Sequence, residues 1–410
     1  MEIHSTIKCN HKGENVKITK LSLAAIAAMT ITTGAMADLV SNVKMDGQVK
    51  LWYETNDKND NSMFHKDNSS GDAALTVGAT ADMGPVKIGS KVYAVSTMGL
   101  ENSIVAGART ARAAGADNEA WIGELHATAV VGKTTIKAGR QALNTPFAFT
   151  ENWNVLPNTF DAIVVINKDI ENFTLVGASV LRGNGNNAGH AAWKAGKTFN
   201  KLNAAMVATH AKVGPVPVNA YYYDVNAIPT IATADVSAYW IDASLPIGPA
   251  KLTAIYAGAQ SQGSGANDDI TSMALKATAK FGGVSLLGAY STVSDDVSTL
   301  AIANVGTGFK KTKLPTAGVY TDGLFVAQPG SNAFKLKAAT KLAGFGVAAQ
   351  FINNTNDLTS SKETTEFDLI VSKKIGAVAV KGIILNRTFK DSALDAAEGT
   401  HVRVITSYNF

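Results

Sequence analysis

Basic side chains recur at alternate positions in several segments of this sequence, with apolar residues between them. Lys335 and Lys337, for example, alternate with Phe334 and Leu336. Successive side chains of a β-strand point to opposite faces, so this spacing places the ammonium groups on one face. A face rich in lysine attracts anions and carboxylate-bearing solutes. The charged residues assigned to this face are Lys44, Asp46, Lys50, Lys87, Lys91, Glu124, Lys137, Lys276, Lys280, Lys335, Lys337, Lys341 and Arg403. Arg140 is a further candidate, although its own place in the alternation is on the opposite face.

Acidic residues with the same parity are fewer than basic ones. The best candidates are Asp46, Glu54, Glu124, Glu366 and Asp368. The excess of lysine therefore predicts a positive potential along this face. A simpler interpretation of each single lysine stays open. If these segments cross a membrane, a lysine that faced the lipid would cost roughly 2–4 kcal/mol at the middle of the bilayer, so it would point to the other face whatever its function.

The remaining polar residues do not form a recognisable catalytic, cofactor or metal pattern. His126, His210 and His401 are scattered without metal-ligand spacing, and no nucleophile-elbow motif occurs. Residues 57–61 resemble the start of a calcium loop, but Ser62 stands where the sixth-position glycine belongs. We expect a solvated external loop there, with loosely bound calcium left open. The sequence predicts no enzyme, no cofactor and no metal site, although a Ser–His pair at the rim of a barrel is not excluded by sequence.

The elements that carry these side chains are predicted to be strands of about ten residues with one apolar face. Of the 410 residues, 46% are apolar and only 17% charged, compared with about 25% in ordinary globular chains. Long connections alternate with connections of about two to five residues, which is typical of outer-membrane barrels. The predicted strands are 43–54, 73–82, 86–95, 120–131, 134–141, 161–167, 173–182, 202–210, 216–224, 234–245, 251–259, 270–281, 284–292, 334–342, 346–354, 365–374, 377–387 and 401–410.

This pattern predicts an all-β fold, an 18-stranded antiparallel transmembrane β-barrel with short periplasmic turns and long external loops. The final segment, 401–410, ends on Phe410 and must pair with 43–54 to remove the last open edge. That pairing would place Arg403 near Lys44 and Lys50 on the inner face. Barrels of 16–18 strands leave an aqueous channel, so the charged face would line a pore.

The N-terminal residues have the three parts of an export signal. Lys17 and Lys20 form the positive end, 21–31 the apolar core and 35–37 a small-x-small cleavage site. We expect a leader at 1–37, with the signal peptide at 17–37, and a barrel domain at 38–410. Val16 is then a candidate initiator. Without the expected leader, the chain has 33 basic and 31 acidic residues, and this near-balance gives no support to nucleic-acid binding.

The segment 142–160 carries a family resemblance. Gly139-Arg140-Gln141, then Thr145-Pro146, then Leu156-Pro157-Asn158-Thr159-Phe160 resemble the OprD-type outer-membrane porins of Gram-negative bacteria. The low-charge, lysine-rich barrel is also similar to the major porins of the ε-proteobacteria. The resemblance implies that 142–160 is a constriction loop folded into the lumen. The chain departs from the family at Asn154, where a basic residue is usual. Arg140 has outward parity, so either a bulge turns it inward or it does not line the pore.

We therefore expect a passive channel in the Gram-negative outer membrane for small hydrophilic solutes and ions, biased to anions or carboxylates. The resemblance implies a homotrimer that contacts outer-membrane lipid and lipopolysaccharide, with Phe410 as the signal to the barrel-assembly machinery. The alternative is an adhesin or structural envelope protein that acts through external loops. The loop 293–333, with Lys310, Lys311 and Lys313, is the feature that supports this alternative.

Overall fold

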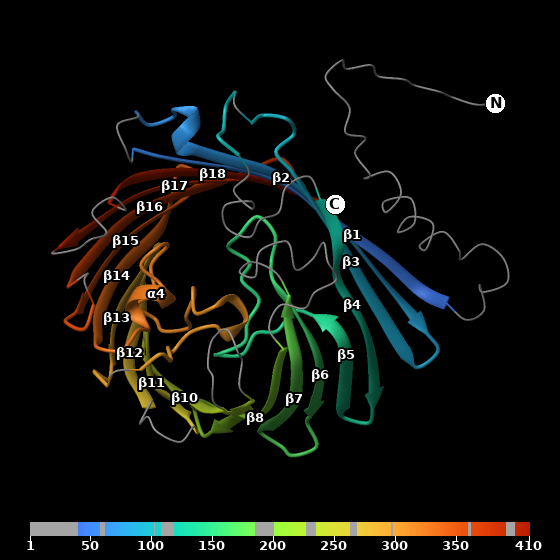
Figure 1. Ribbon diagram of the computed structural model, residues 1–410. Helices are drawn as coiled ribbons and strands as arrows, with labels where there is room; N and C mark the ends of the chain where they lie inside the picture. The colour runs from blue at the N-terminus through green and yellow to red at the C-terminus, as the bar shows by residue number, and fades with distance from the viewer. Residues whose placement is uncertain are drawn as a thin grey trace, which may run out of the picture.

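Eighteen antiparallel strands form one closed barrel in the computed structural model (Figure 1). The structure describes residues 40–410 apart from 58–61, 102, 108–118, 185–200, 227–234, 263–268, 297, 360–361 and 391–397. Each strand pairs with its neighbours in the sequence, and β1 also pairs with β18. The strands are β1 Val40–Asn56, β2 Ser69–Met83, β3 Val86–Ser96, β4 Glu119–Val131, β5 Thr134–Gln141, β6 Thr159–Asn167, β7 Phe173–Asn184, β8 Lys201–Val213, β9 Val216–Val225, β10 Val236–Ile247, β11 Ala250–Ser261, β12 Asp269–Phe281, β13 Val284–Val293, β14 Ser331–Leu342, β15 Phe345–Asn356, β16 Glu363–Ile375, β17 Val378–Lys390 and β18 Gly399–Asn409.

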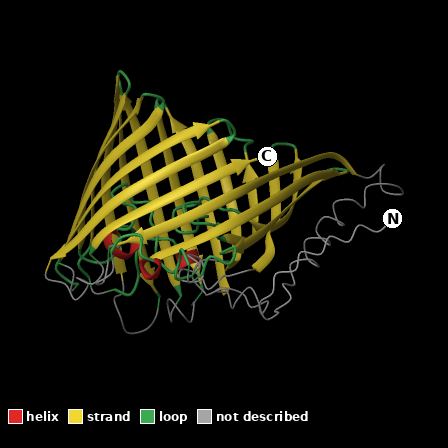
Figure 2. Ribbon diagram, turned by 90° about the horizontal axis from the view of Figure 1, so that it is seen from above, coloured by secondary structure: helices red, strands yellow, loops and turns green. Residues whose placement is uncertain are grey.

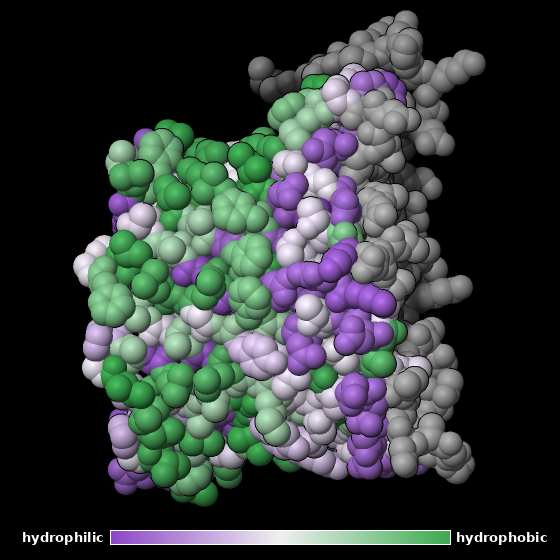
Figure 3. All heavy atoms as spheres, turned by 90° about the vertical axis from the view of Figure 1, so that its left-hand side faces the viewer, coloured by the Kyte–Doolittle hydropathy of each residue, from purple (hydrophilic) through white to green (hydrophobic). Residues whose placement is uncertain are grey.

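The two faces of each strand differ as the alternation predicts. On β14, Phe334 and Leu336 are 39% and 58% exposed on the outer face, whereas Ala333 and Lys335 are 1% and 9% exposed on the inner face. Figure 3 shows the outer surface as a broad apolar area bordered by a band of polar residues. Large apolar groups remain on the outside because the hydrocarbon of a bilayer takes the place of a core there.

The barrel closes at its two terminal strands. Gly47 and Phe410 exchange backbone hydrogen bonds, with N–O distances of 2.8 and 3.0 Å. The Phe410 ring lies over Gly47, and a Cβ at that glycine would stand 2.2 Å from the ring. A larger residue at position 47 would therefore displace the terminal ring, which covers the seam from outside.

Short and long connections lie at opposite ends of the barrel (Figure 2). The short turns use glycine where the backbone is left-handed, as at Gly132 (φ 59°) and Gly282 (φ 53°). The other regular elements are short helical turns: η1 (Lys66–Asn68), η2 (Val305–Thr307) and α4 (Gly323–Val326). Among the described residues, no helix is both long and apolar enough to cross a membrane.

The predicted fold class and strand number are confirmed, and the main differences lie at strand ends. β1 begins at Val40 and β2 at Ser69, so both are longer than predicted. Cross-strand pairing extends them beyond the alternating stretch, as Thr55 pairs with Ser69. The export signal and most of the calcium-like segment 57–61 lie outside the described residues.

Candidate functional site

The connection between β5 and β6 contacts opposite parts of the inner wall. Near its start, Phe147 packs edge-on against Tyr223 of β9 and Trp240 of β10, with ring centroids 5.4 and 6.2 Å apart. Near its end, the buried Val155 belongs to the same apolar cluster as Trp52 of β1. The residues 142–158 therefore bridge the β9–β10 wall and the β1 wall inside the ring of strands (Figure 1).

The connection between β13 and β14, residues 294–330, also lies inside the barrel. The fully buried Glu366 carboxylate on β16 accepts backbone N–H bonds from Val319 (2.5 Å), Tyr320 (3.1 Å) and Thr321 (2.6 Å). A Cβ at Gly318 would stand 2.5 Å from Glu366 Oε1, so the glycine permits this close approach. Successive N–H groups that converge on one anion form a strong, directional anchor.

Tyr320 connects the same segment to the seam of the barrel. Its hydroxyl donates to the Glu54 carboxylate on β1. Its ring lies 5.4 Å from the guanidinium carbon of Arg387 and 5.1 Å from that of Arg403. Two cations against one aromatic ring add cation–π attraction to the hydrogen bonds. The tip of the long connection is thus held by β1, β16, β17 and β18 together.

The two connections are also bonded to each other through Asn304. Its amide Nδ2 donates to Phe149 O (2.8 Å) and Glu151 Oε1 (2.9 Å), and its Oδ1 accepts from Phe149 N (3.2 Å). Val305 N donates to Phe147 O at 2.9 Å. Asn304 is fully buried, so its hydrogen-bonding groups are used within the protein. The connections 142–158 and 294–330 therefore form one bonded unit, which we call the loop partition.

Lys311 and Asp322 form an ion pair inside the loop partition. Lys311 Nζ lies 2.9 Å from Asp322 Oδ2 and donates to Val319 O at 2.8 Å. It also lies 4.7 Å from the Trp153 ring centre. Burial raises the pKa of the Asp322 carboxyl, and the Lys311 ammonium acts against that rise.

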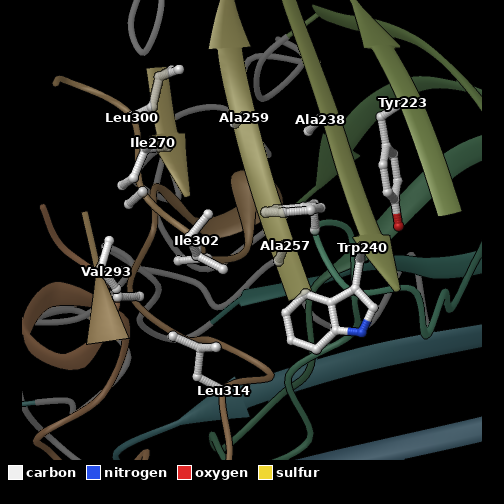
Figure 4. Packing of buried hydrophobic residues seen from close by; sticks show 14 of the residues in the cluster. Tyr223, Ala238, Trp240, Ala257, Ala259, Ile270, Val293, Leu300, Ile302 and Leu314 are labelled. Carbon is white, nitrogen blue, oxygen red and sulfur yellow. The ribbon is translucent and has the colours of Figure 1, made fainter. Parts of the chain in front are cut away.

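Apolar packing holds the loop partition against β10–β13. Ile302 and Leu314 of the long connection lie near Ala257, Ile270 and Val293 of the wall (Figure 4). The small residues at 238, 257 and 259 leave room on the inner face for these aliphatic side chains. Part of the inner wall is therefore apolar because the loop partition covers it, and it does not face water.

Lysines line the inner wall on the side of the short turns. A cavity of about 610 Å³ is lined by Lys50, Lys341 and Lys381 together with Trp153 and Ser407. A second cavity, of about 430 Å³, is lined by Lys251, Lys280 and Lys337. Among the described residues, neither lining includes an acidic side chain. The space beside the loop partition is therefore strongly cationic.

The structure places most predicted site residues on the inner face, but they differ in what they contact. Lys335 donates to Ala317 O, so it holds the long connection. Glu124 lies 3.3 Å from Lys91 and 3.8 Å from His126, and Lys87 lies 3.7 Å from Asp82. The other predicted residues on the inner face are Lys44, Asp46, Lys50, Lys137, Lys276, Lys280, Lys337, Lys341 and Arg403.

Arg140 is the exception, and its assignment as a pore-lining residue is wrong. It pairs across the sheet with Leu125, which is 50% exposed on the outer face, and with Asp161. Its Nε donates to Asp161 Oδ1 at 2.8 Å and its Nη1 to Ile122 O at 3.0 Å. No bulge re-aims the side chain, because the register of β5 is regular through this position.

Among the strand residues that the structure describes, the inner-face cations that the sequence prediction missed include Lys251, Lys374, Lys381 and Arg387. Lys381 and Arg387 lie on β17, where Ile383 and Leu385 on the same inner face are 4% and 1% exposed. Apolar residues therefore occupy both faces of β17, so alternation does not separate them. The regular spacing of Lys381, Ile383, Leu385 and Arg387 could have identified the inner face of β17. Ile383 and Leu385 can be apolar there because the loop partition covers this face.

The expectation that 293–333 projects outward is also wrong. Lys311 is engaged with Asp322, and Lys313 Nζ donates to Asn144 Oδ1 at 2.6 Å in the loop partition. Burial lowers the pKa of Lys313, which lies 4.4 Å from the Phe149 ring centre. Lys311 and Lys313 are thus bonded within the loop partition inside the barrel, so they do not support the alternative of an adhesin that acts through external loops.

A closed 18-stranded barrel with a charged lumen defines an outer-membrane channel protein. A family model described as Gram-negative porin matches residues 22–298, and the chain belongs to that family. No curated protein sequence matches the chain. The chain therefore lies in the outer membrane.

Solved structures support the same fold. Acinetobacter baumannii OccAB2 aligns with a TM-score of 0.70 and 11% identity, over 91% of this chain and 98% of that chain. Pseudomonas aeruginosa OccK3 (OpdO) aligns with a TM-score of 0.69 and 13% identity, over 92% and 97%. Pseudomonas aeruginosa OccK2 (OpdF), solved in complex with glucuronate, aligns with a TM-score of 0.67 and 12% identity, over 90% and 98%.

Proposed function

We propose that this porin is a passive channel that favours anions and carboxylate-bearing solutes. The observation that carries the proposal is the cavity lined by Lys50, Lys341 and Lys381 without an acidic neighbour among the described lining residues. Several inner-face acids have other uses, since Glu54 and Glu366 bind the loop partition. The lumen therefore keeps more unpaired positive than negative charge along the route of a solute.

We propose that the loop partition forms the constriction. The segment 142–158 crosses between opposite walls, and Asn304 ties it to the second connection. A two-loop constriction limits the size of the solute, while the lysines beside it set the sign of the charge. The glucuronate bound to the similar OccK2 (OpdF) is a sugar acid, which has the solute chemistry expected here.

Planar-bilayer recording tests this proposal. Purified protein should give stable conductance steps, and the reversal potential in a KCl gradient should show chloride preferred over potassium. Glucuronate added on one side should shorten or block openings more than uncharged glucose at equal concentration. A cation-selective reversal potential, or equal effects of the two sugars, would overturn the proposed selectivity while leaving the channel itself intact.

A further inference from the structure

A row of cross-strand partners on the inner wall begins and ends with a lysine and has small residues between. The strands β14–β17 form one continuous part of the wall (Figure 1). At one level of this wall, the successive partners are Lys341, Gly346, Ser372 and Lys381. Neighbouring strands lie about 4.8 Å apart, so the two lysines are anchored roughly 14 Å apart. The middle of the row is therefore a hollow between two ammonium groups.

The adjacent row has the same composition. It lies two residues further along β16 and runs across the seam, and its partners from β16 to β1 are Lys374, Ala379, Ser407 and Lys50. The residues of both rows all line the cavity of about 610 Å³. We call these two rows the lysine cradle. Its four lysines mark the corners, and its floor consists of small residues.

The floor of the lysine cradle has no room for larger side chains. Ser372 Oγ donates to Gly346 O at 3.4 Å, and a Cβ at Gly346 would stand 2.8 Å from Ser372 Oγ. A larger residue at 346 would therefore displace Ser372. Asn152 and Trp153 of the loop partition also line the cavity. A ligand in the lysine cradle would thus lie between the barrel wall and the loop partition.

The protein does not neutralise the charge of the lysine cradle. Lys341, Lys374 and Lys381 form no ion pair with the described residues, and Lys50 Nζ donates to a backbone oxygen, Asn154 O, at 3.1 Å. Because like charges repel, ammonium groups held around one cavity are stabilised by a ligand that carries several negative charges. A monovalent anion compensates only one of them.

A third row has the same lysine spacing but a filled middle. From β11 to β14 the successive partners are Lys251, Thr278, Leu287 and Lys337. Leu287 and Thr278 occupy the positions that correspond to Ser372 and Gly346. The third row therefore matches the lysine cradle in charge and span, and it lacks the open floor.

We propose that the lysine cradle binds a polyvalent anion, a compact solute whose several negative charges are carried by phosphate or carboxylate groups. Lysine ammonium groups bind phosphate as point charges, and the corners of the cradle surround such an ion on two sides. The inference rests on the proposed function, because the cradle lines the same cavity, and it names the class of solute that the cavity fits. The bound ion obstructs the passage of smaller anions beside the loop partition.

Calorimetric titration of the folded porin in detergent tests the binding without any current. Tripolyphosphate and citrate are the polyvalent probes, and acetate is the monovalent comparison. At 0.1 M salt we expect one or both polyvalent ions to bind at least roughly 10-fold more tightly than acetate. The binding should be lost at 1 M salt, where the screening length falls to about 3 Å. Tripolyphosphate alone would assign the site to phosphate and citrate alone to carboxylate, whereas equal affinity for all three ions would overturn the proposal.

Three variants test the geometry of the lysine cradle. Ser372→Leu fills the floor and keeps every lysine, so it should weaken the binding roughly 10-fold. Lys341→Gln/Lys374→Gln should weaken it at least as much, and Lys251→Gln/Lys337→Gln, in the third row, should leave it unchanged. Heat-modifiable migration confirms that each barrel is folded. Equal losses in the two double variants, or full binding by Ser372→Leu, would show that diffuse charge holds the ion and would reject the cradle.

The reversal potential of the wild type separates this inference from the proposed function. A chloride-selective channel that binds neither polyvalent probe would overturn the lysine cradle and leave the proposed selectivity standing. A cation-selective channel that binds tripolyphosphate tightly, and loses it in Ser372→Leu, would support the cradle and overturn the proposed selectivity.

Discussion

Arg403 on β18 donates a hydrogen bond from Nε to Oε2 of Glu54 on β1, at 2.7 Å, across the seam where the barrel closes. Tyr320 of the long connection donates to the same carboxylate. One buried acid therefore serves both the closure of the wall and the placement of the loop partition. This relationship links the shape of the lumen to the pairing of the first and last strands.

Removing the Glu366 charge should release the long connection. The variant Glu366→Gln replaces a carboxylate that accepts N–H bonds from three consecutive residues, and hydrogen bonds to a charged group contribute about 1.5–3 kcal/mol each. We expect a larger single-channel conductance and more frequent sublevels, measured in planar bilayers. Glu363→Gln, on the same strand and bonded to Asn353, is the matched control. Unchanged conductance of a folded Glu366→Gln barrel would show that the anchor does not set the pore.

Breaking the bond between the two connections should loosen both. Asn304→Leu removes the acceptor of the buried Phe149 N–H, at a cost of about 1–3 kcal/mol for an unsatisfied group. It also removes one of two donors to Phe149 O, which still accepts from Asn158 Nδ2. Current records should show more open-channel noise and a wider range of conductances than the wild type. Asn353→Leu, away from the loop partition, serves as the comparison. The idea of one bonded unit is wrong if both variants give the same noise.

Neutralising the lysine cavity should weaken anion selectivity. We expect Lys341→Gln/Lys381→Gln to shift the reversal potential towards cations, because both ammonium groups line the same cavity. The shift should be large at 0.1 M salt and small at 1 M, since the screening length falls from about 10 Å to about 3 Å. Lys66→Gln tests the location, because Lys66 of η1 lies 3.2 Å from Asp67 and is not part of the cavity lining. An equal shift in that variant would place the selectivity outside the lumen.

The terminal ring should matter for assembly more than for conduction. Deleting Phe410 removes a backbone pair with Gly47 and the ring that covers it. We expect a lower yield of heat-modifiable folded barrel in the membrane, while the channels that do form keep their conductance. Gly47→Val should reproduce the defect with Phe410 present, because its Cβ would clash with the ring at 2.2 Å. If both variants fold normally, Phe410 has no role in assembly.

The barrel itself follows from the sequence alone. A strand in lipid must present apolar groups outward and satisfy its backbone with neighbours, so local alternation determines the side of Lys335, Lys341 and Arg403 without further information. The same alternation places Arg140 on the outer face, as the structure does. The prediction that Arg140 lines the pore came from the family resemblance and was wrong. Strand number is likewise predictable, because each turn interrupts the alternation.

The interior was decided only by the tertiary structure. Glu366 meets Tyr320 across 46 positions of the chain, and Asn304 meets Phe149 across 155. The sequence around each partner does not predict these contacts. Glu366 has the pattern of any acidic residue on an inner face, and Asn304 that of any amide in a loop. The apolar inner face of β17 and the small residues of β10 and β11 make sense only once a loop covers them. Alternation predicts which side chains of a strand face lipid and which face the lumen. The way the loops fill the lumen depends on contacts between residues far apart in the chain, and the periodicity of the strands carries no information about these.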